Sequence, residues 1–260
     1  MLKRLLKLLF GHIHLKSKRK KVKDKFSVGF VERDTPDSRD YRCSIVQIGE
    51  LAESASIKNR PPIRNQETIG SCASHAAIRC YEIQLLNFKP NWYLEQSELF
   101  HYYNARKDNG TFPNDRGMTI REAMMTLVKY GSAMEYAWPY TVSKFNEVPP
   151  SYVYSVAHLY HPKQCETVDS IDLIKRSIMD NVAVVCGIEA WTSFWRVNES
   201  NMLYKPSGTY RGGHAVTIVA YDNVGPIFDN SWGIWNDNKG QFQMTWEDFQ
   251  KYSFNCWRLI

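Results

Sequence analysis

Cys72 lies where a Pro- and Gly-containing loop gives way to a helix-forming stretch, NQETIGSCASHAA (residues 65–77). A thiol in the first turn of a helix feels the partial positive charge of the helix N-terminus, which favours the nucleophilic thiolate. Free cysteines are also among the most frequently buried residues, so this local motif alone leaves plain packing open. Other residues must supply a base and an orienting group before Cys72 can be assigned as a nucleophile.

Three residues elsewhere could fill those roles. His214 opens a β-type run in RGGHAVTIVAYD and could take the proton of the thiol. Asn230, in DNSWG, follows 16 residues later, which is far enough for the chain to return as a neighbouring strand and orient the imidazole. Gln66 could donate an amide hydrogen to an oxyanion beside the backbone N–H of Cys72. Together these residues fill every role in acyl transfer by a thiol.

The same segments resemble papain-type (C1-like) cysteine peptidases. NQETIGSC is similar to the family's Asn-Gln-Gly-x-Cys-Gly-Ser-Cys, and GGHAVTIVAYD and DNSWGIWNDNKGQFQM are similar to its histidine and asparagine segments. Cys72 and His214 are 142 residues apart, inside the roughly 130–150 of that family, and Asn230 at 158 lies slightly beyond it. Shorter stretches such as DSRDY, SELFHYYNAR and GMTIREAM resemble the bacterial and phage-type branch. The resemblance covers about residues 35–260.

The resemblance implies a role for each residue of these motifs. Cys72 would be the nucleophile, His214 the general acid/base, Asn230 the orienting group and Gln66 the oxyanion donor. Supporting positions would be Trp232, which would shield the His–Asn hydrogen bond, with Gly70, Ser71 and Gly213. The implied fold is α+β, a helical left lobe and a β-barrel-like right lobe with the active-site cleft between them. The implied substrate is a peptide or protein, with no cofactor and no metal.

Three positions bear on how far this pattern is followed. Ile69 stands where secreted relatives carry a structural cysteine, so that disulfide cannot form, and Ala73 replaces the usual Trp after the nucleophile. His75, one helical turn after Cys72, could compete as a base, but we expect its tip to point into the left lobe as a packing residue.

Other functions stay open. The alternative function is that of a non-catalytic papain-fold protein, used for binding or as a structural component of a larger assembly. Transfer of the acyl group to an amine in place of water also stays open.

The elements that must position these residues change along the chain. Apolar periodicity and end signals predict helices over 71–86, 94–110, 115–133 and 168–181, with Thr119 as a cap and Gly131 as a stop. Short β-type runs cover 182–190, 212–222, 225–232 and 240–246. A helical half followed by a β-rich half indicates an α+β protein. We therefore expect a peptidase domain over 59–260, with lobes of about 59–145 and 146–260.

The charge is divided unevenly. Residues 1–25 hold ten Lys or Arg and one Asp, so the rest of the chain carries a net −3 within the overall +6. Leu2, Leu5, Leu6, Leu9 and Ile13 share one helical face, and a polybasic run follows, which is typical of binding to an anionic membrane surface. A solvated tail is the competing interpretation. A nucleic-acid contact is less favoured, because this arm shows no interleaved aromatic residues and the acidic body gives no reason to expect one.

The remaining sequence features concern processing and location. Residues 26–58 form an N-terminal extension that could cross the cleft, though it is short for an inhibitory prosegment. The six cysteines form no C-x-x-C pair and no zinc-ligand cluster, which predicts reduced thiols. LLKLLF is too short and too interrupted by lysine for a secretory signal. We therefore expect a cytoplasmic or virion-associated protein, peripheral at a membrane if the arm binds one.

Overall fold

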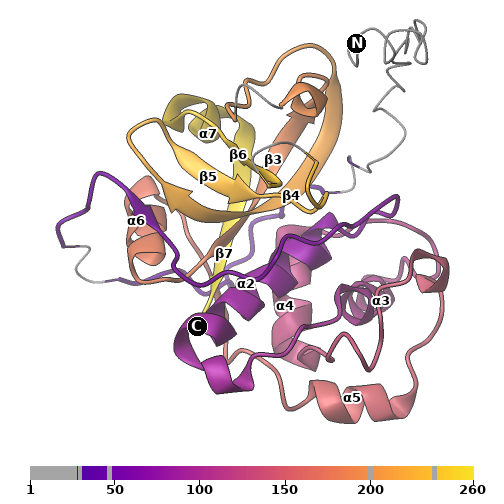
Figure 1. Cartoon of the computed structure of the whole chain (residues 1–260). Coiled ribbons are helices and arrows are strands. Elements are labelled where there is room, and N and C mark those ends of the chain that lie inside the picture. Colours follow the sequence, from indigo (N-terminus) through magenta and orange to yellow (C-terminus); the bar gives the residue numbers. More distant parts are fainter. Residues whose placement is uncertain (1–27, 29–30, 46–48, 198–201, 236–238) are drawn as a thin grey trace, which may run out of the picture.

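The computed structural model describes residue 28 and residues 31–45, 49–197, 202–235 and 239–260. The basic arm over 1–25 and its amphipathic face lie outside these residues. The expected α+β architecture is confirmed. Helices α2 to α5 gather in one half of the molecule and strands β3 to β6 in the other, with β7 running between them (Figure 1).

Helix α2 (Cys72–Phe88) is the centre of the helical half. Ala73, Ala76 and Ala77 let neighbouring elements approach closely, and nearly every residue of the helix is buried. A helix covered on all sides lies in the interior, and this one has both halves of the molecule as its cover. The hydroxyl of Thr217 in the sheet donates to the carbonyl of Ala76 at 3.3 Å.

Helices α3 and α4 pack against α2, and their ends follow local capping chemistry. Helix α3 (Glu98–Asp108) is capped by the Ser97 hydroxyl. Helix α4 (Ile120–Tyr130) begins with a capping box between Thr119 and Glu122 and ends at Gly131, whose φ of 71° favours glycine. The sequence-based assignments of the cap and the stop are confirmed. Helix α5 (Ser151–Ala157) lies in a stretch for which no helix was predicted.

The other half is built on a seven-stranded antiparallel sheet in the described part of the chain, with order β2-β7-β3-β4-β5-β6 and β1 paired to β4. The strands are β1 (Ala55–Ser56), β2 (Cys165–Thr167), β3 (Val184–Trp191), β4 (Tyr210–Tyr221), β5 (Pro226–Asp229), β6 (Gln241–Gln243) and β7 (Ser253–Leu259). Helices α6 (Ile171–Met179) and α7 (Trp246–Tyr252) flank the sheet. Short 3-10 turns are η2 (Pro90–Trp92), η3 (Val142–Lys144) and η4 (Phe194–Arg196).

The N-terminal extension is in contact with both halves. The side chain of Asp34 accepts hydrogen bonds from the indole N–H of Trp257 in β7, at 2.8 Å, and from the backbone N–H of Arg121 in α4, at 3.0 Å. Further along, the N–H of Cys43 donates to the carbonyl of Thr167 in β2 at 2.9 Å. Val31 forms a β-bridge with Gly213 in β4. The segment 31–43 is therefore part of the fold.

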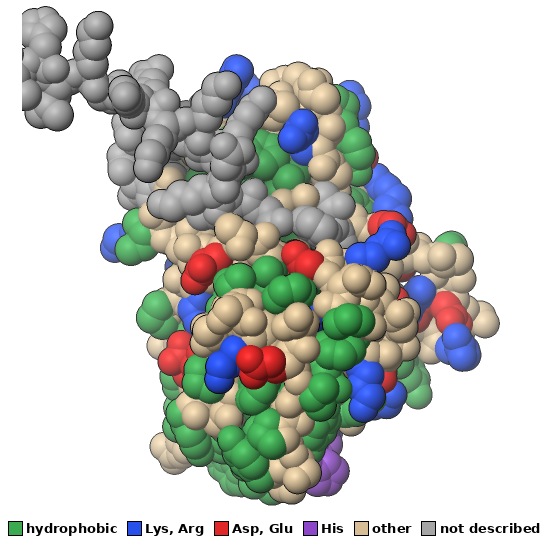
Figure 2. All heavy atoms as spheres, turned by 90° about the vertical axis from the view of Figure 1, so that its right-hand side faces the viewer, with side chains coloured by type: hydrophobic (Ala, Val, Ile, Leu, Met, Phe, Trp, Pro, Cys, Tyr) green, Lys and Arg blue, Asp and Glu red, His purple; other side chains and the backbone are tan. Residues whose placement is uncertain are grey.

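The surface of the described residues is mixed in character. On the face that Figure 2 shows, acidic and basic side chains lie interspersed among apolar and uncharged ones. Within the described ranges, no helix has the length and apolar content needed to cross a membrane.

Candidate active site

Cys72 is the first residue of α2, at the boundary between the two halves, and is only 1% exposed. Burial raises the pKa of its thiol to about 11, although the backbone N–H groups of Ala215, Ala73 and Cys72 itself lower it. The backbone N–H groups at the start of the helix thus favour the thiolate, as expected from the sequence, while burial opposes it. The helix N-terminus stabilises negative charge, but removing the sulfur from water costs more.

His214 and Asn230 are brought together by strand pairing. His214 lies in β4, Asn230 follows directly after β5, and the register of these strands places Thr217 opposite Asp229. Nε2 of His214 lies 2.8 Å from Oδ1 of Asn230. That oxygen also accepts the backbone N–H of Ser231 at 2.8 Å, which identifies it as the acceptor and makes Nε2 the protonated ring nitrogen. Nδ1 then carries the lone pair of a neutral imidazole.

The imidazole is neutral for a physical reason. Burial lowers the pKa of His214 to about 4, with Asn230 raising it and His75 lowering it further. Nδ1 makes no hydrogen bond to any other residue that the structure describes. The sulfur of Cys72 interacts with the N–H of Ala215, the residue after His214, so the thiol lies beside the histidine strand. Burial therefore disfavours the charged form of both residues.

An aromatic layer covers the imidazole. The ring centroid of Trp232 lies 5.2 Å from that of His214, and that of Phe194 lies at 5.7 Å. Trp232 is 1% exposed and Phe194 fully buried. These rings exclude water from the His214–Asn230 hydrogen bond, which strengthens it. The shielding role expected of Trp232 agrees with this position.

Gln66 lies in the loop that leads into α2 and is fully buried. Its N–H donates to the carbonyl of Ser231 at 2.7 Å, and its Oε1 accepts the Ser231 hydroxyl at 2.5 Å. Its Nε2 donates to the carbonyl of Ile69 at 3.0 Å. The amide is therefore held in one orientation, between the segment that follows Asn230 and the turn that precedes Cys72.

The supporting positions have distinct contacts. The N–H of Gly70 donates to Oδ1 of Asp115 at 3.0 Å, and the hydroxyl of Ser71 lies 2.7 Å from that of Tyr140. A side chain at Gly213 would collide with the carbonyl of Val31, so the close approach of that segment requires glycine. The glycine before His214 thus admits the N-terminal extension to the edge of the site.

His75 turns away from the reacting groups. Its Nδ1 lies 3.1 Å from the carbonyl of Ser71, and its ring meets Tyr140 edge-on at 4.9 Å between centroids. Burial lowers the pKa of His75 to about 3. Its position corresponds to the packing interpretation drawn from the sequence.

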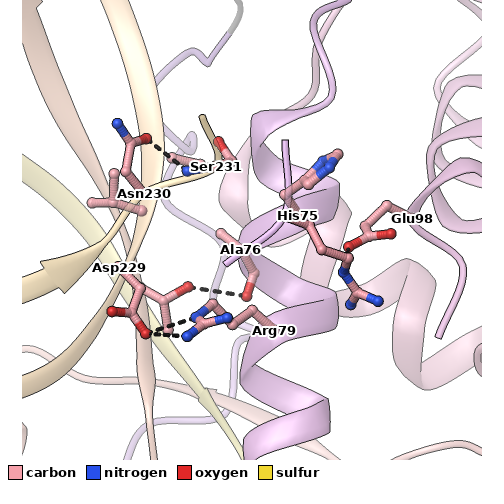
Figure 3. Close-up of a pocket in the computed structure, with 11 residues that line it drawn as sticks. His75, Ala76, Arg79, Glu98, Asp229, Asn230 and Ser231 are labelled. Atoms are coloured by element: carbon pink, nitrogen blue, oxygen red, sulfur yellow. Dashed lines mark hydrogen bonds and ion pairs between the residues drawn. The ribbon is translucent and has the colours of Figure 1, made fainter. Parts of the chain in front are cut away.

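Two clusters of charge lie beside the candidate site. In the first, Arg79 extends from α2 to Asp229, the residue before Asn230, at 2.5 Å (Figure 3). Arg60 reaches the same carboxylate at 3.3 Å. In the second, Arg64 meets the carboxylates of Glu82, Glu95 and Glu98 at 2.6, 3.0 and 2.6 Å.

Several residues around the site were not found from the sequence. Asp115 and Tyr140, which fix the turn before Cys72, come from the helical half, 43 and 68 residues further along the chain. Arg64, two residues before Gln66, and Ser231, the residue after Asn230, adjoin predicted site residues. Their proximity to the motifs was the only available signal, because each acts through a partner that is distant in sequence.

The described residues contain neither a metal-binding cluster nor a disulfide. Across the described ranges, no three His, Cys, Asp or Glu side chains gather as they would to hold a metal ion. All six cysteines are free thiols in the structure.

Comparison with known proteins identifies the family. The model of the papain family cysteine proteases matches residues 52–255. An uncharacterized peptidase C1-like protein of Acanthamoeba polyphaga mimivirus is 30% identical over 200 residues, covering 70% of this chain. This chain spans 64% of the length of that relative.

Solved structures agree. Xylellain, a cysteine protease from Xylella fastidiosa, superimposes with a TM-score of 0.83 at 25% identity, over 91% of this chain and 97% of its own. Procathepsin L 3 of Tenebrio molitor larval midgut shares the fold, with a TM-score of 0.67 at 16% identity, over 87% of this chain and 76% of its own. A bacterial and a viral relative support in part the bacterial and phage-type branch suggested by the sequence. The chain belongs to the papain family of cysteine proteases.

Proposed function

We propose that the protein hydrolyses peptide bonds through an acyl-enzyme formed on Cys72. The observation that carries the proposal is the 2.8 Å hydrogen bond from His214 to Asn230, because it leaves Nδ1 as a base beside the helix that begins at Cys72. The substrate class is peptides or proteins, as the family implies. No cofactor is needed for any step.

The reaction begins with attack of the Cys72 sulfur on the scissile carbonyl carbon. The thiol proton passes to Nδ1 of His214, and the new imidazolium is stabilised by Asn230. The oxyanion is stabilised by the side-chain amide of Gln66 and the backbone N–H of Cys72. Collapse breaks the C–N bond, and His214 gives its proton to the leaving amine.

Water completes the cycle. His214 takes a proton from water as it attacks the thioester carbonyl, and the second oxyanion collapses with release of a carboxylic acid. The sulfur leaves as thiolate and recovers its proton from His214. In this scheme the dyad starts and ends neutral, so charge separation occurs only while substrate occupies the site.

Substitution of the proposed groups tests this assignment. With a peptide library as substrate, Cys72→Ala should abolish turnover with little change in melting temperature. Asn230→Ala should lower the rate less than His214→Ala does, because Asn230 only orients the base. Gln66→Ala should lower kcat by about 10- to 1000-fold. Cys43→Ala, a change at another free thiol, is the control and should leave turnover intact. Residual hydrolysis above a few per cent in Cys72→Ala would contradict the assignment.

The alternative function has its own test. If the wild type folds but shows no hydrolysis, and its Cys72 does not react with a peptidyl epoxide, a non-catalytic binding or structural role would be favoured.

The pH profile tests the neutral pair. His214 must be unprotonated to accept the thiol proton, and its pKa is about 4. The acidic limb of kcat/KM should therefore have its midpoint near pH 4, below the ordinary range of histidine. A midpoint near the ordinary value of about 6.5 would contradict a dry, neutral imidazole.

We also propose, from the sequence of residues 1–25, that the arm attaches the enzyme to an anionic membrane surface, with the enzyme otherwise cytoplasmic or virion-associated. Deleting the arm should abolish salt-sensitive recovery on anionic liposomes and leave peptidase activity unchanged, because all the proposed catalytic residues lie beyond residue 60. Equal recovery of full-length and shortened protein would refute membrane binding. Loss of activity on deletion would show that the arm supports the fold.

A further inference from the structure

The backbone around Arg64 runs beside the segment that follows Asn230. The carbonyl of Arg64 accepts the N–H of Gly233 at 3.0 Å, Asn65 forms a β-bridge with Trp232, and the N–H of Gln66 donates to Ser231 at 2.7 Å. Residues 64–66 thus act as an added antiparallel strand against residues 231–233. This contact fixes Gln66 relative to the half that carries His214 and Asn230.

The side chain of Arg64 goes the other way, into the helical half. Its Nη2 meets Glu82 of α2 at 2.6 Å, its Nε meets Glu98 of α3 at 2.6 Å, and its Nη1 meets Glu95 at 3.0 Å. The side chains of Glu82 and Glu98 are 0% and 2% exposed. A guanidinium offers several donors in one plane, so it can hold three carboxylates in a fixed arrangement.

The partners of Arg64 are themselves fixed. Oε1 of Glu82 accepts the backbone N–H of Gln96 at 2.7 Å, and Glu98 opens α3. Glu82 lies ten residues after Cys72 on the same buried helix. Arg64 therefore ties the backbone that carries Gln66 to the helix that carries the sulfur.

We propose that Arg64 is a positioning residue that sets the distance and angle between the Gln66 amide and Cys72. This inference rests on the proposed role of Gln66 as oxyanion donor. An oxyanion donor contributes only when its N–H is correctly aimed, and a displacement of about 1 Å can cost about 100-fold in rate. The loop from 65 to 71 contains no helix and is held by contacts with other segments, through Ser231, Asp115 and Tyr140. Arg64 adds to these a contact with the helix that carries Cys72.

The test is a cycle of Arg64→Met with Gln66→Ala in the full chain. Arg64→Met should lower kcat by about 10- to 100-fold, no more than Gln66→Ala does, with KM within about threefold. In the Gln66→Ala background the same change should have almost no further effect, since no aimed donor is left to misplace. Arg64→Lys should recover part of the loss, because the ammonium keeps the charge without the planar donor set.

Two controls separate positioning from general damage. Alkylation of Cys72 by iodoacetamide displaces iodide from a saturated carbon and forms no oxyanion, so its rate should stay within about twofold of wild type. Arg258→Lys alters another partly buried ion pair, with Glu166, and should leave kcat unchanged. If Arg64→Met does not fold, Arg64→Lys replaces it in the cycle. Arg64→Lys should then lower kcat by a smaller factor in the wild type and have no further effect in the Gln66→Ala background.

The outcomes are distinct. The positioning role would be overturned if Arg64→Met lowered kcat equally in the wild-type and Gln66→Ala backgrounds. It would also be overturned if folded Arg64→Met kept the wild-type kcat, or if its rate of alkylation fell together with kcat. A wild-type kcat in Gln66→Ala alone would overturn the oxyanion assignment itself.

Discussion

The two charged clusters beside the site have opposite balances. Around Asp229, two cations, Arg79 and Arg60, share one carboxylate. Around Arg64, one cation meets three carboxylates. The Asp229 cluster joins the two halves through its side chains, whereas the Arg64 cluster lies in the helical half and reaches the other half through the backbone of Arg64. Both clusters are close to residues proposed to act in catalysis. They should nevertheless respond differently to substitution and to pH.

The difference follows from which charge lacks compensation. Burial raises the pKa of Glu82 to about 7, with Arg64 lowering it and Glu98 raising it, and burial likewise raises that of nearby Glu135 to about 7. The acid-rich cluster can relieve its excess charge by binding protons. Arg79 cannot lower its charge in a corresponding way, because a guanidinium does not lose its proton in proteins. One cluster is thus adjustable, and the other depends on its single anion.

The largest expected effect is that of removing that anion. Asp229→Asn should lower the free energy of unfolding by about 3–5 kcal/mol, because it leaves the buried Arg79 without a counter-charge. Asp180→Asn, which breaks the more exposed pair with Arg176 on the surface of α6, is the control and should cost less than about 1 kcal/mol. Denaturant unfolding at pH 7 measures both. Equal effects would refute the contrast between the clusters.

A smaller effect is expected in the acid-rich cluster, and it should depend on pH. Between pH 4.5 and 7 the unfolded chain releases protons that folded Glu82 retains, so the free energy of unfolding should fall as pH rises through this range and level off above it. The fall is on the order of 1–3 kcal/mol. Glu82→Gln should flatten this slope and be neutral or stabilising at pH 8. A strongly destabilised variant at pH 8 would mean that the Arg64–Glu82 pair stabilises the fold by more than the burial of its charges costs.

The smallest effect is expected at Arg60. Its side chain is 27% exposed, and Arg79 still compensates Asp229 when Arg60 is changed. Arg60→Gln should therefore change the free energy of unfolding by less than about 1 kcal/mol. A loss as large as that of Asp229→Asn would show that the two cations act as one unit.

Local chemistry explains what the sequence predicted well. Thr119 and Gly131 bound α4 because a capping box and a positive φ depend on neighbouring residues only. The β4 and β5 runs were found because apolar residues sit between clear turn signals. Their antiparallel return brings His214 to Asn230, so the spacing of two motifs predicted a contact between them.

Tertiary effects explain what was missed. Strand β7 pairs with β3 through a register shift between Val185 and Gly187, which disturbs the alternation that would have marked a strand. The thiol pKa at Cys72 is governed by burial, which the motif does not contain. Arg64 finds partners 18 to 34 residues away, among many other glutamates, and no pattern selects them in advance.

The docking of the N-terminal extension has a consequence for biosynthesis. Asp34 is made well before its partners Asn255 and Trp257, which follow it by 221 and 223 residues. One edge of strand β3 likewise pairs with β7, which is made later. Contacts of such long sequence separation slow folding, because the intervening chain must be closed into a loop before they form. A ribosome-bound chain from which β7 has not yet emerged should therefore hold an incomplete active site, and activity should appear only once β7 has left the ribosome.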